Sequence, residues 1–338
     1  MSRYSRQELF SGIGAAGQAR LRAARVVLVG CGALGSALAD MMVRAGVGGL
    51  TLVDRDFVEE SNLQRQALFD EEDARRGLPK AVAAEAKLRR INSDVAVRGL
   101  VSDLHAGNAT EILKGADAVL DGTDNFETRF LVNDVCVREG IPWVYGACVG
   151  SYGLALAVQP RVSPCLRCVL GEMPPPGSGP TCDTAGVVAP IVHVIAGIQA
   201  AEALKLLAGR TQDLLPGIAT VDLWRGAFEV MDLTGQSPSC PACTEGRFDY
   251  ATAAPTGAAT ILCGRDAIQV RPPAGAQIDL AALAGRLASV GDVAANEYLV
   301  RFSTGDARMV VFGDGRAIVK GVTDPAQART LYSKYVGS

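Results

Sequence analysis

A glycine-rich turn near the start of the chain limits the possible folds more than any other segment. Residues 30–35 read G-C-G-A-L-G, which matches the pattern G-x-G-x-x-G, between an apolar run at Arg25–Gly30 and an expected helix over Ala33–Gly46. Glycines let a backbone approach a phosphate closely, and the helix N-terminus attracts its charge. We therefore favour a nucleotide site here over a tight turn that binds no ligand. The residues expected at the phosphates are Gly30, Gly32, Ala33 and Gly35.

Apolar runs and helical patterns then alternate along the chain. Strands are expected at 50–54, 95–101, 116–121 and 143–148, and helices at 79–92 and 125–139. This alternation predicts an α/β fold with a Rossmann-like, doubly wound and mostly parallel sheet. Later runs at 152–159, 219–223 and 227–233 predict an antiparallel extension of the sheet. A Pro/Gly-rich loop at 173–180 and a long helix over 186–207 come between them.

The composition shifts once more at residues 251–259, whose sequence A-T-A-A-P-T-G-A-A is typical of a linker. We predict a nucleotide-binding domain over 1–250 and a small α+β domain over 260–338. The second domain is expected to have strands at 298–302, 308–312 and 317–320, and helices at 280–289 and 325–335. Its sequence assigns it no role.

Composition and charge exclude several classes of protein. Of the 338 residues, 49% are apolar and 20% charged, and the net charge is −3, which is typical of a soluble globular chain. Because no basic stripe is present, we expect no nucleic-acid partner. The first nine residues form no apolar signal core, and the helix over 186–207 carries polar residues (His193, Gln199, Glu202 and Lys205). We therefore expect no membrane span and, by default, a cytoplasmic location.

Charged and amide side chains cluster where the predicted strands end. Asp54 follows the second strand, about 20 residues after the glycine turn, where nucleotide-binding folds place the acid that binds a ribose. Asp124 follows the strand at 116–121. The carboxyl ends of parallel strands meet at one edge of a sheet, so these side chains are expected together. The full set is Asp54, Asp56, Asn62, Gln64, Arg65, Lys80 and Asp124.

Two cations in this set favour ATP over NAD. Arg65 and Lys80 would neutralise charge at a phosphorus under attack, and Asp124 would hold a magnesium ion. Any one of these residues alone would be interpreted as a solvated surface charge, but the group at successive strand ends is not. An NAD-dependent oxidoreductase would account for the glycine turn and Asp54, but it would leave Arg65 and Lys80 unexplained.

The nine cysteines include two C-x-x-C pairs, Cys165/Cys168 and Cys240/Cys243. Two such pairs have the ligand spacing of a structural zinc site with four thiolates. A redox role is the alternative for either pair alone. Cys31, Cys136 and Cys148 are expected in the core, as is Cys263. The chain has only two histidines, His105 and His193, and structural roles are expected for both.

In combination, the motifs resemble those of the bacterial E1-like enzymes, the family of the molybdopterin-synthase and thiamine-pathway adenylyltransferases. The resemblance covers roughly residues 3–243. The matching pieces are R-Y-S-R-Q at 3–7, the glycine turn, S-N-L-Q-R-Q at 61–66, G-L-P-K at 77–80, G-T-D-N at 122–125, T-C-D-T-A-G-V-V-A-P at 181–190 and both C-x-x-C pairs.

This resemblance implies an ATP-dependent adenylyltransferase, using Mg²⁺ and carrying structural Zn²⁺, that activates the C-terminal Gly-Gly carboxylate of a ubiquitin-like sulfur carrier protein. It implies ribose contact by Asp54, with phosphate and magnesium contacts by Ser61, Asn62, Leu63, Gln64, Arg65, Lys80, Asp124 and Asn125. The counterpart of Arg6 reaches the ATP of the other subunit, which implies a homodimer. A separate sulfur donor protein is also expected, because the chain has no rhodanese-like loop.

Cys182 and the substrate leave alternatives open. Cys182 precedes the long helix, whose N-terminus can lower the pKa of a thiol, so it is a candidate for sulfur or acyl transfer. A cysteine that is merely retained in a loop is nearly as well supported. The substrate could also be a different peptide or small-molecule carboxylate, and a catalytically inactive scaffold is disfavoured because Arg65, Lys80 and Asp124 are all present. The carrier and its pathway are not determined by the sequence.

Overall fold

A computed structural model describes residues 2–337 except 176–178, 180, 236–238, 254–258, 263–266, 273–275 and 306. The chain divides into two compact units, Met1–Ala254 and Pro255–Ser338, each of which is described by itself. Regular structure reaches into both ends of the segment expected to be a linker, since helix α11 covers Asp249–Thr252 and strand β9 covers Ala259–Leu262.

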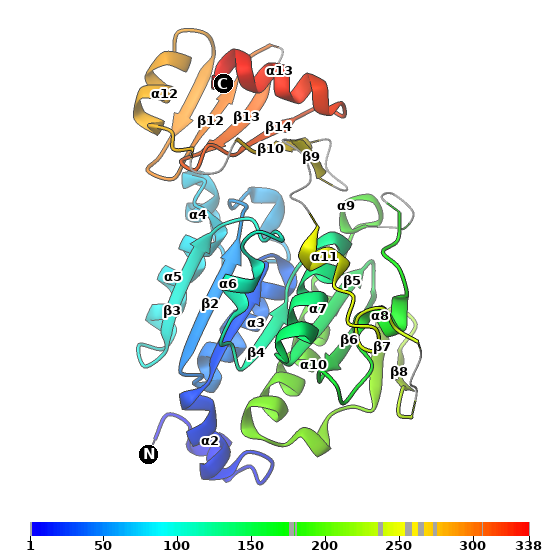
Figure 1. The fold of residues 1–338 in the computed structure, drawn as a ribbon. Helices are drawn as coiled ribbons and strands as arrows, with labels where there is room; N and C mark the ends of the chain where they lie inside the picture. The colour runs from blue at the N-terminus through cyan, green and yellow to red at the C-terminus, as the bar shows by residue number, and fades with distance from the viewer. Residues whose placement is uncertain are drawn as a thin grey trace. The chain divides into compact units, whose positions relative to one another are not determined.

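The first unit is built on an eight-stranded sheet with the order β3-β2-β1-β4-β5-β6-β7-β8 (Figure 1). Its strands are β1 (Arg25–Val29), β2 (Gly49–Asp54), β3 (Ala96–Val101), β4 (Ala118–Asp121), β5 (Trp143–Val149), β6 (Tyr152–Val158), β7 (Gly217–Asp222) and β8 (Ala227–Asp232). The first five are parallel, and β6 to β8 continue the sheet antiparallel. The predicted fold class is confirmed.

Helices cover both faces of this sheet. They are α1 (Ser5–Leu9), α2 (Gly14–Ala23), α3 (Ala33–Ala45), α4 (Glu71–Arg76), α5 (Lys80–Ile91), α6 (Ala109–Leu113), α7 (Phe126–Glu139), α8 (Leu166–Leu170), α9 (Cys182–Ala185), α10 (Ala189–Ala208) and α11, with short 3-10 turns η1 (Glu60–Asn62) and η2 (Thr211–Asp213). Helix α3 packs against α5 and α10, whereas α7 packs against α6, α8 and α11. Strand β1 is buried from Val26 to Val29, because a parallel strand between two helical layers needs apolar side chains on both faces.

Most predicted elements agree with the structure to within three residues, and the elements missed in the first unit are α2 and several short helices. Helices α1, α4, α6, α8 and α9 have four to six residues each, too few to show an apolar period. The long helix begins at Ala189 rather than near 186, because the separate turn of α9 and Gly186 come first.

Helix α10 is the one described helix that is long and apolar enough, by length and composition, to cross a membrane, yet 56% of its most apolar window is buried inside the fold. Gln199 and Glu202 lie on its buried side, where Gln199 Nε2 donates to the carbonyl of Asp121 at 2.8 Å and Glu202 accepts from the backbone N–H of Leu215 at 2.8 Å. These partners are typical of a core helix.

The second unit is a six-stranded antiparallel sheet with the order β11-β12-β13-β14-β10-β9 and two helices. Its other elements are β10 (Ala267–Val270), β11 (Asp292–Ala295), β12 (Leu299–Ser303), β13 (Arg308–Phe312), β14 (Ala317–Lys320), α12 (Leu280–Leu287) and α13 (Pro325–Tyr335). Val300, Phe302 and Val319 pack with Leu283 and Leu331 in one core. The sequence predicted β12 to β14 and both helices but missed the three short strands.

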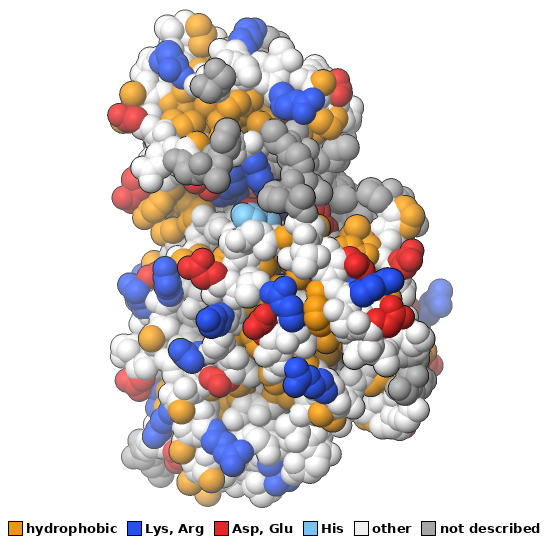
Figure 2. Space-filling view, viewed as in Figure 1, with side chains coloured by type: hydrophobic (Ala, Val, Ile, Leu, Met, Phe, Trp, Pro, Cys, Tyr) orange, Lys and Arg blue, Asp and Glu red, His pale blue; other side chains and the backbone are white. Residues whose placement is uncertain are grey.

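On the face viewed in Figure 2, basic side chains are interspersed with acidic ones.

Candidate functional site

Three glycines interlock beneath the predicted nucleotide site. Gly30 has a φ of +85°, and a Cβ placed on Gly35 would lie 1.9 Å from the carbonyl oxygen of Gly30. A Cβ on Gly122, which follows β4, would lie 2.4 Å from the same oxygen. By contrast, a Cβ on Gly32 would meet no atom closer than 3.9 Å. The turn is therefore closely packed below and open at Gly32, as expected if a phosphate approaches from that side.

Asp54 ties this turn to the end of β2. Its carboxylate accepts from the backbone N–H of Cys31 at 2.6 Å and from that of Asp56 at 2.7 Å. Burial raises the pKa of Asp54, and the nearby Lys80 opposes that shift. Each oxygen keeps a further lone pair, so the carboxylate can still accept from a ribose hydroxyl.

Lys80 lies at the start of α5 and faces Asp56. Its backbone N–H donates to the carbonyl of Asp56 at 2.9 Å, and its Nζ lies 3.5 Å from Asp56 Oδ2. The Lys80 side chain is only 4% exposed. A buried ammonium held beside a carboxylate at a strand end is well placed to meet an anionic ligand.

Residues 61–66 form a compact turn after β2. Asn62 is buried, and its Oδ1 accepts from the backbone N–H of Glu59 at 3.1 Å, while Arg65 Nη1 donates to the carbonyl of Ser61 at 2.8 Å. Leu63 is half-buried and Gln64 exposed. Gln66 was not singled out from the sequence. Its side chain is 3% exposed, and its Oε1 has no hydrogen-bond partner among the described residues. Its Nε2 would lie 3.9 Å from a Cβ placed on Gly32, so the Gln66 side chain lies beside the open position of the turn.

The loop after β4 is organised by a buried arginine that sequence reasoning missed. Asp121 accepts from the backbone N–H of Thr123 at 2.8 Å and from Arg129 Nε at 3.2 Å, and Arg129 Nη2 donates to the carbonyls of Thr123 and Gly146. Burial raises the pKa of Asp121, opposed by Arg129. The position of Arg129 among the apolar residues Phe126, Phe130 and Leu131 of the predicted helix was the available signal. This anchoring leaves Asp124 exposed at the tip of the loop.

Asn125 directly precedes α7, and its Oδ1 accepts from the backbone N–H of Thr128 at 2.9 Å. Its side-chain oxygen therefore caps the helix, and its Nδ2 lies 3.5 Å from Asp124 Oδ1. One set of residues follows the carboxyl ends of β1, β2 and β4 or lies beside them, and we call it the nucleotide edge. It comprises residues 30–35, 54–56, 61–66, 80 and 121–125. Strand order reverses between β1 and β4, the usual ligand position in such sheets.

Arg6 lies at the opposite ends of the parallel strands from the nucleotide edge. Helix α3 starts at the glycine turn and runs for 13 residues, about 20 Å at the usual rise. Gln7 Nε2 donates to the carbonyl of Ala45 at the far end of α3, at 2.9 Å, so α1 is held there (Figure 1). The exposed Arg6 is thus remote from the nucleotide edge of its own chain.

The four predicted zinc ligands converge. The sulfurs of Cys165, Cys168, Cys240 and Cys243 all lie within 4.8 Å of one another. The Cys165–Cys240 and Cys165–Cys168 sulfurs are 3.8 Å apart, and the Cys168–Cys243 sulfurs are 3.5 Å apart. A tetrahedral zinc site with Zn–S bonds of about 2.3 Å needs sulfurs about 3.8 Å apart, so these residues fit zinc. We call this set the four-cysteine site.

Cys182 lies at a different helix end from the one expected. It is the first residue of the four-residue α9, capped by Thr181, and not of the long α10. Its thiol donates to the carbonyl of Cys148 at 3.0 Å. Burial raises the pKa of Cys148 to about 12, so that neighbour is a poor nucleophile. Of the remaining candidates, His193 is exposed, while Cys263 lies outside the described residues.

Comparison with known proteins identifies the family. A sequence model described as the ThiF family matches residues 4–242. The chain belongs to the ThiF family. The resemblance to E1-like enzymes and the prediction of an adenylyltransferase are confirmed, and the oxidoreductase alternative is rejected. Membership of the ThiF family implies the use of ATP.

Two relatives indicate how far the similarity extends. The chain is 48% identical over 337 residues to the sulfur carrier protein ThiS adenylyltransferase of Bacillus subtilis, covering 99% of both chains. It is 41% identical over 249 residues to the SAMP-activating enzyme E1 of Haloferax volcanii, covering 74% of this chain and 91% of the relative. The similarity to the Bacillus protein therefore includes the second unit.

Among solved structures, the fold is similar to that of E. coli MccB with ATP. The TM-score is 0.62 with 24% identity, and the match covers 72% of this chain and 74% of the other. At this identity the likeness supports the fold alone.

Proposed function

We propose that this chain adenylates the C-terminal Gly-Gly carboxylate of a ubiquitin-like sulfur carrier protein with Mg²⁺-ATP and releases pyrophosphate. The nucleotide edge carries the proposal, because it places Lys80, Asp54 and Asp56 beside an open glycine turn. Full-length similarity to a ThiS adenylyltransferase supports the choice of substrate.

In this scheme a carboxylate oxygen of the carrier attacks the α-phosphorus of ATP. The bond from that phosphorus to the bridging oxygen breaks, and pyrophosphate leaves with the electron pair. A carboxylate is already ionised near neutral pH, so no histidine base is needed. The protein has to align the reactants and offset the negative charge that develops.

Roles follow from position at the nucleotide edge. The open backbone at Gly32 would receive phosphate and Asp54 would bind the ribose, while Lys80 and Arg65 would offset charge at the phosphates. Asp124, exposed at the tip of its loop, would be a magnesium ligand. A bound magnesium ion would further neutralise the phosphates.

ATP–pyrophosphate exchange that depends on a carrier ending in Gly-Gly tests this function. Arg65→Ala and Asp124→Ala should each lower exchange by about a hundredfold or more, because each removes a charged contact to the transition state. Arg44→Ala is a matched control, since Arg44 pairs with Asp40 near the far end of α3. Failure of exchange with every such carrier of the same cell would reject this substrate. Exchange with an unrelated peptide acid would favour the alternative carboxylate.

We further propose a homodimer in which Arg6 completes the site of the partner. The position of α1 at the opposite edge of the sheet supports this, because Arg6 is remote from its own nucleotide edge. Mixing two inactive variants, Arg6→Ala and Asp124→Ala, should restore activity, since a mixed dimer contains one site with both residues intact. No recovery after subunit exchange would show that Arg6 does not act across subunits. Sulfur would come from a separate donor, and Cys182 remains a candidate for its transfer.

A further inference from the structure

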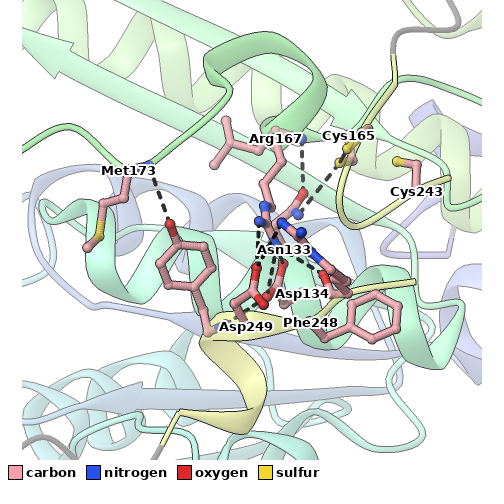
Figure 3. A network of polar contacts seen from close by, with 12 residues as sticks. Asn133, Asp134, Cys165, Arg167, Met173, Cys243, Phe248 and Asp249 are labelled. Atoms are coloured by element: carbon pink, nitrogen blue, oxygen red, sulfur yellow. Dashed lines mark hydrogen bonds and ion pairs between the residues drawn. The ribbon is translucent and has the colours of Figure 1, made fainter. Parts of the chain in front are cut away.

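Helix α7 begins beside the nucleotide edge, and a fully buried amide near its middle contacts the four-cysteine site. Asn133 has no exposed surface. Its Nδ2 donates to Cys165 Sγ at 3.6 Å, and its Oδ1 accepts from the backbone N–H of Leu166 at 2.9 Å (Figure 3). Both ends of one side chain are therefore directed at the same C-x-x-C turn.

Because the surroundings of Asn133 are apolar, burial of its amide lowers the stability of the fold unless the amide forms hydrogen bonds. Neighbouring side chains on α7, including Phe130, Val132 and Cys136, belong to the apolar core. A buried amide in such a place costs stability unless its donors and acceptor are used. An apolar side chain would fill the same space, so the amide is explained by what it binds rather than by packing.

Cys165 is one of two sulfurs that need such a donor. Cys165 and Cys240 are buried, whereas Cys168 is partly exposed and Cys243 is exposed. Water can hydrogen-bond to the exposed sulfurs and spread their charge, but it does not reach Cys165. A protein N–H must replace it if Cys165 is to serve as a thiolate ligand.

We propose that Asn133 is a positioning residue of the four-cysteine site. Its N–H group holds Cys165 Sγ in the orientation of a metal ligand, and its carbonyl group fixes the start of α8, which follows Cys165. The ligand affected would be zinc, which these four sulfurs fit.

The adjacent residue provides a matched control. Asp134 lies 3.3 Å from Arg167 Nη1 and accepts from the backbone N–H of Tyr250 at 3.0 Å, and Arg167 also pairs with Asp249 at 2.9 Å (Figure 3). This network ties the same segments to α7 but includes no described hydrogen bond from Asp134 to a sulfur. Asp134→Asn thus loosens the region without removing the proposed donor.

The test compares Asn133→Asp with Asp134→Asn in the full zinc-loaded chain. Asn133→Asp keeps the size and an acceptor for Leu166 but loses the N–H donor and adds charge near the thiolates. Competition against a chromophoric chelator should show zinc affinity reduced by about ten- to a hundredfold in Asn133→Asp and by less than about threefold in Asp134→Asn. Equal affinity in Asn133→Asp and the unmodified chain, or an equal loss in both variants, would overturn the proposal.

A measurement on the unmodified chain covers the case in which Asn133→Asp fails to fold. With an NMR-active cadmium isotope in place of zinc, the Asn133 side-chain amide proton should show scalar coupling to the metal across the N–H···S contact. Absence of that coupling in a fully loaded sample would reject the hydrogen bond and the role proposed for it.

Discussion

The two sites of the first unit are built in opposite ways. The nucleotide edge comes from residues 30–125, and its shape depends on backbone contacts such as those among Gly30, Gly35 and Gly122. The four-cysteine site joins pairs about 75 residues apart, and side chains of α7 hold one of its pairs in place. Both sites exist only after distant segments have packed, but one is shaped by backbone contacts and the other by side chains.

The two sites also differ in what they expose. Asp124, Ser61 and Gln64 are exposed at the nucleotide edge, as suits residues that would contact an incoming substrate. At the four-cysteine site Cys165 and Cys240 are buried, and a closed set of four thiolates leaves no position for a reactant. The two sites therefore differ in whether an incoming molecule can reach their side chains.

The largest expected effect comes from two glycines of the same turn. Gly35→Ala should lower the free energy of unfolding by about 3 kcal/mol, because the new Cβ would lie 1.9 Å from a backbone oxygen. Gly32→Ala should fold normally, since its Cβ has space, but should raise the KM for ATP at least about tenfold by blocking the phosphate. Urea unfolding and exchange kinetics separate the two outcomes. Normal ATP kinetics in Gly32→Ala would show that phosphate does not approach there.

Metal removal should affect the second site and spare the first. Because a structural metal contributes directly to folding, stripping it with a chelator under reducing conditions should lower Tm by about 10 °C. Hydrogen exchange should rise in 165–170 and 240–252, while ATP affinity changes less than about threefold. Re-addition of zinc is the control and should restore Tm. A large loss of ATP affinity would mean that the two sites are coupled through α7.

Cys182 is expected to take no part in the adenylation step. Cys182→Ala is expected to keep ATP–pyrophosphate exchange within about twofold, because Cys182 belongs to α9 and its thiol donates to the Cys148 carbonyl. The net worth of such a bond is about 1 kcal/mol. A defect confined to sulfur or acyl transfer would show that the cysteine is functional. Loss of exchange itself would contradict the separation.

The smallest effect is a pH dependence at the surface beside the nucleotide edge. A hydrogen bond from Lys87 lowers the pKa of Asp70, the residue that caps α4. A carboxyl with a lowered folded pKa stabilises above its unfolded pKa of about 4, and this contribution disappears as pH falls through the folded value. Asp70→Asn keeps the cap, so it should cost about 0.5 kcal/mol at pH 7 and nothing at low pH.

Urea unfolding from pH 7 to pH 3 checks this difference. Asp279→Asn, which alters the cap of α12 at a residue with no ion pair in the described contacts, is the control and should show a weaker pH dependence. A difference for Asp70→Asn that grows on acidification would have the wrong sign.

Local patterns made much of this molecule predictable. The strand–turn–helix sequence at residues 25–46 and the acid after β2 were visible because a buried parallel strand and a glycine turn leave direct traces in residue type. Short helices such as α1 and α9 were missed, since one turn of helix shows no period. Arg129 and Gln66 were missed because their importance lies in partners that the sequence does not place beside them.

By itself, the sequence determined the α/β fold, the family motifs and the types of chemical group present, because these depend on short-range periodicity and on glycine's freedom at a few positions. The tertiary structure alone decided that Gly122 lies against the glycine turn, that Arg6 is remote from its own nucleotide edge, and that Asn133 reaches Cys165. Those facts depend on how distant segments pack, and packing of that kind is set by the whole core rather than by any local pattern.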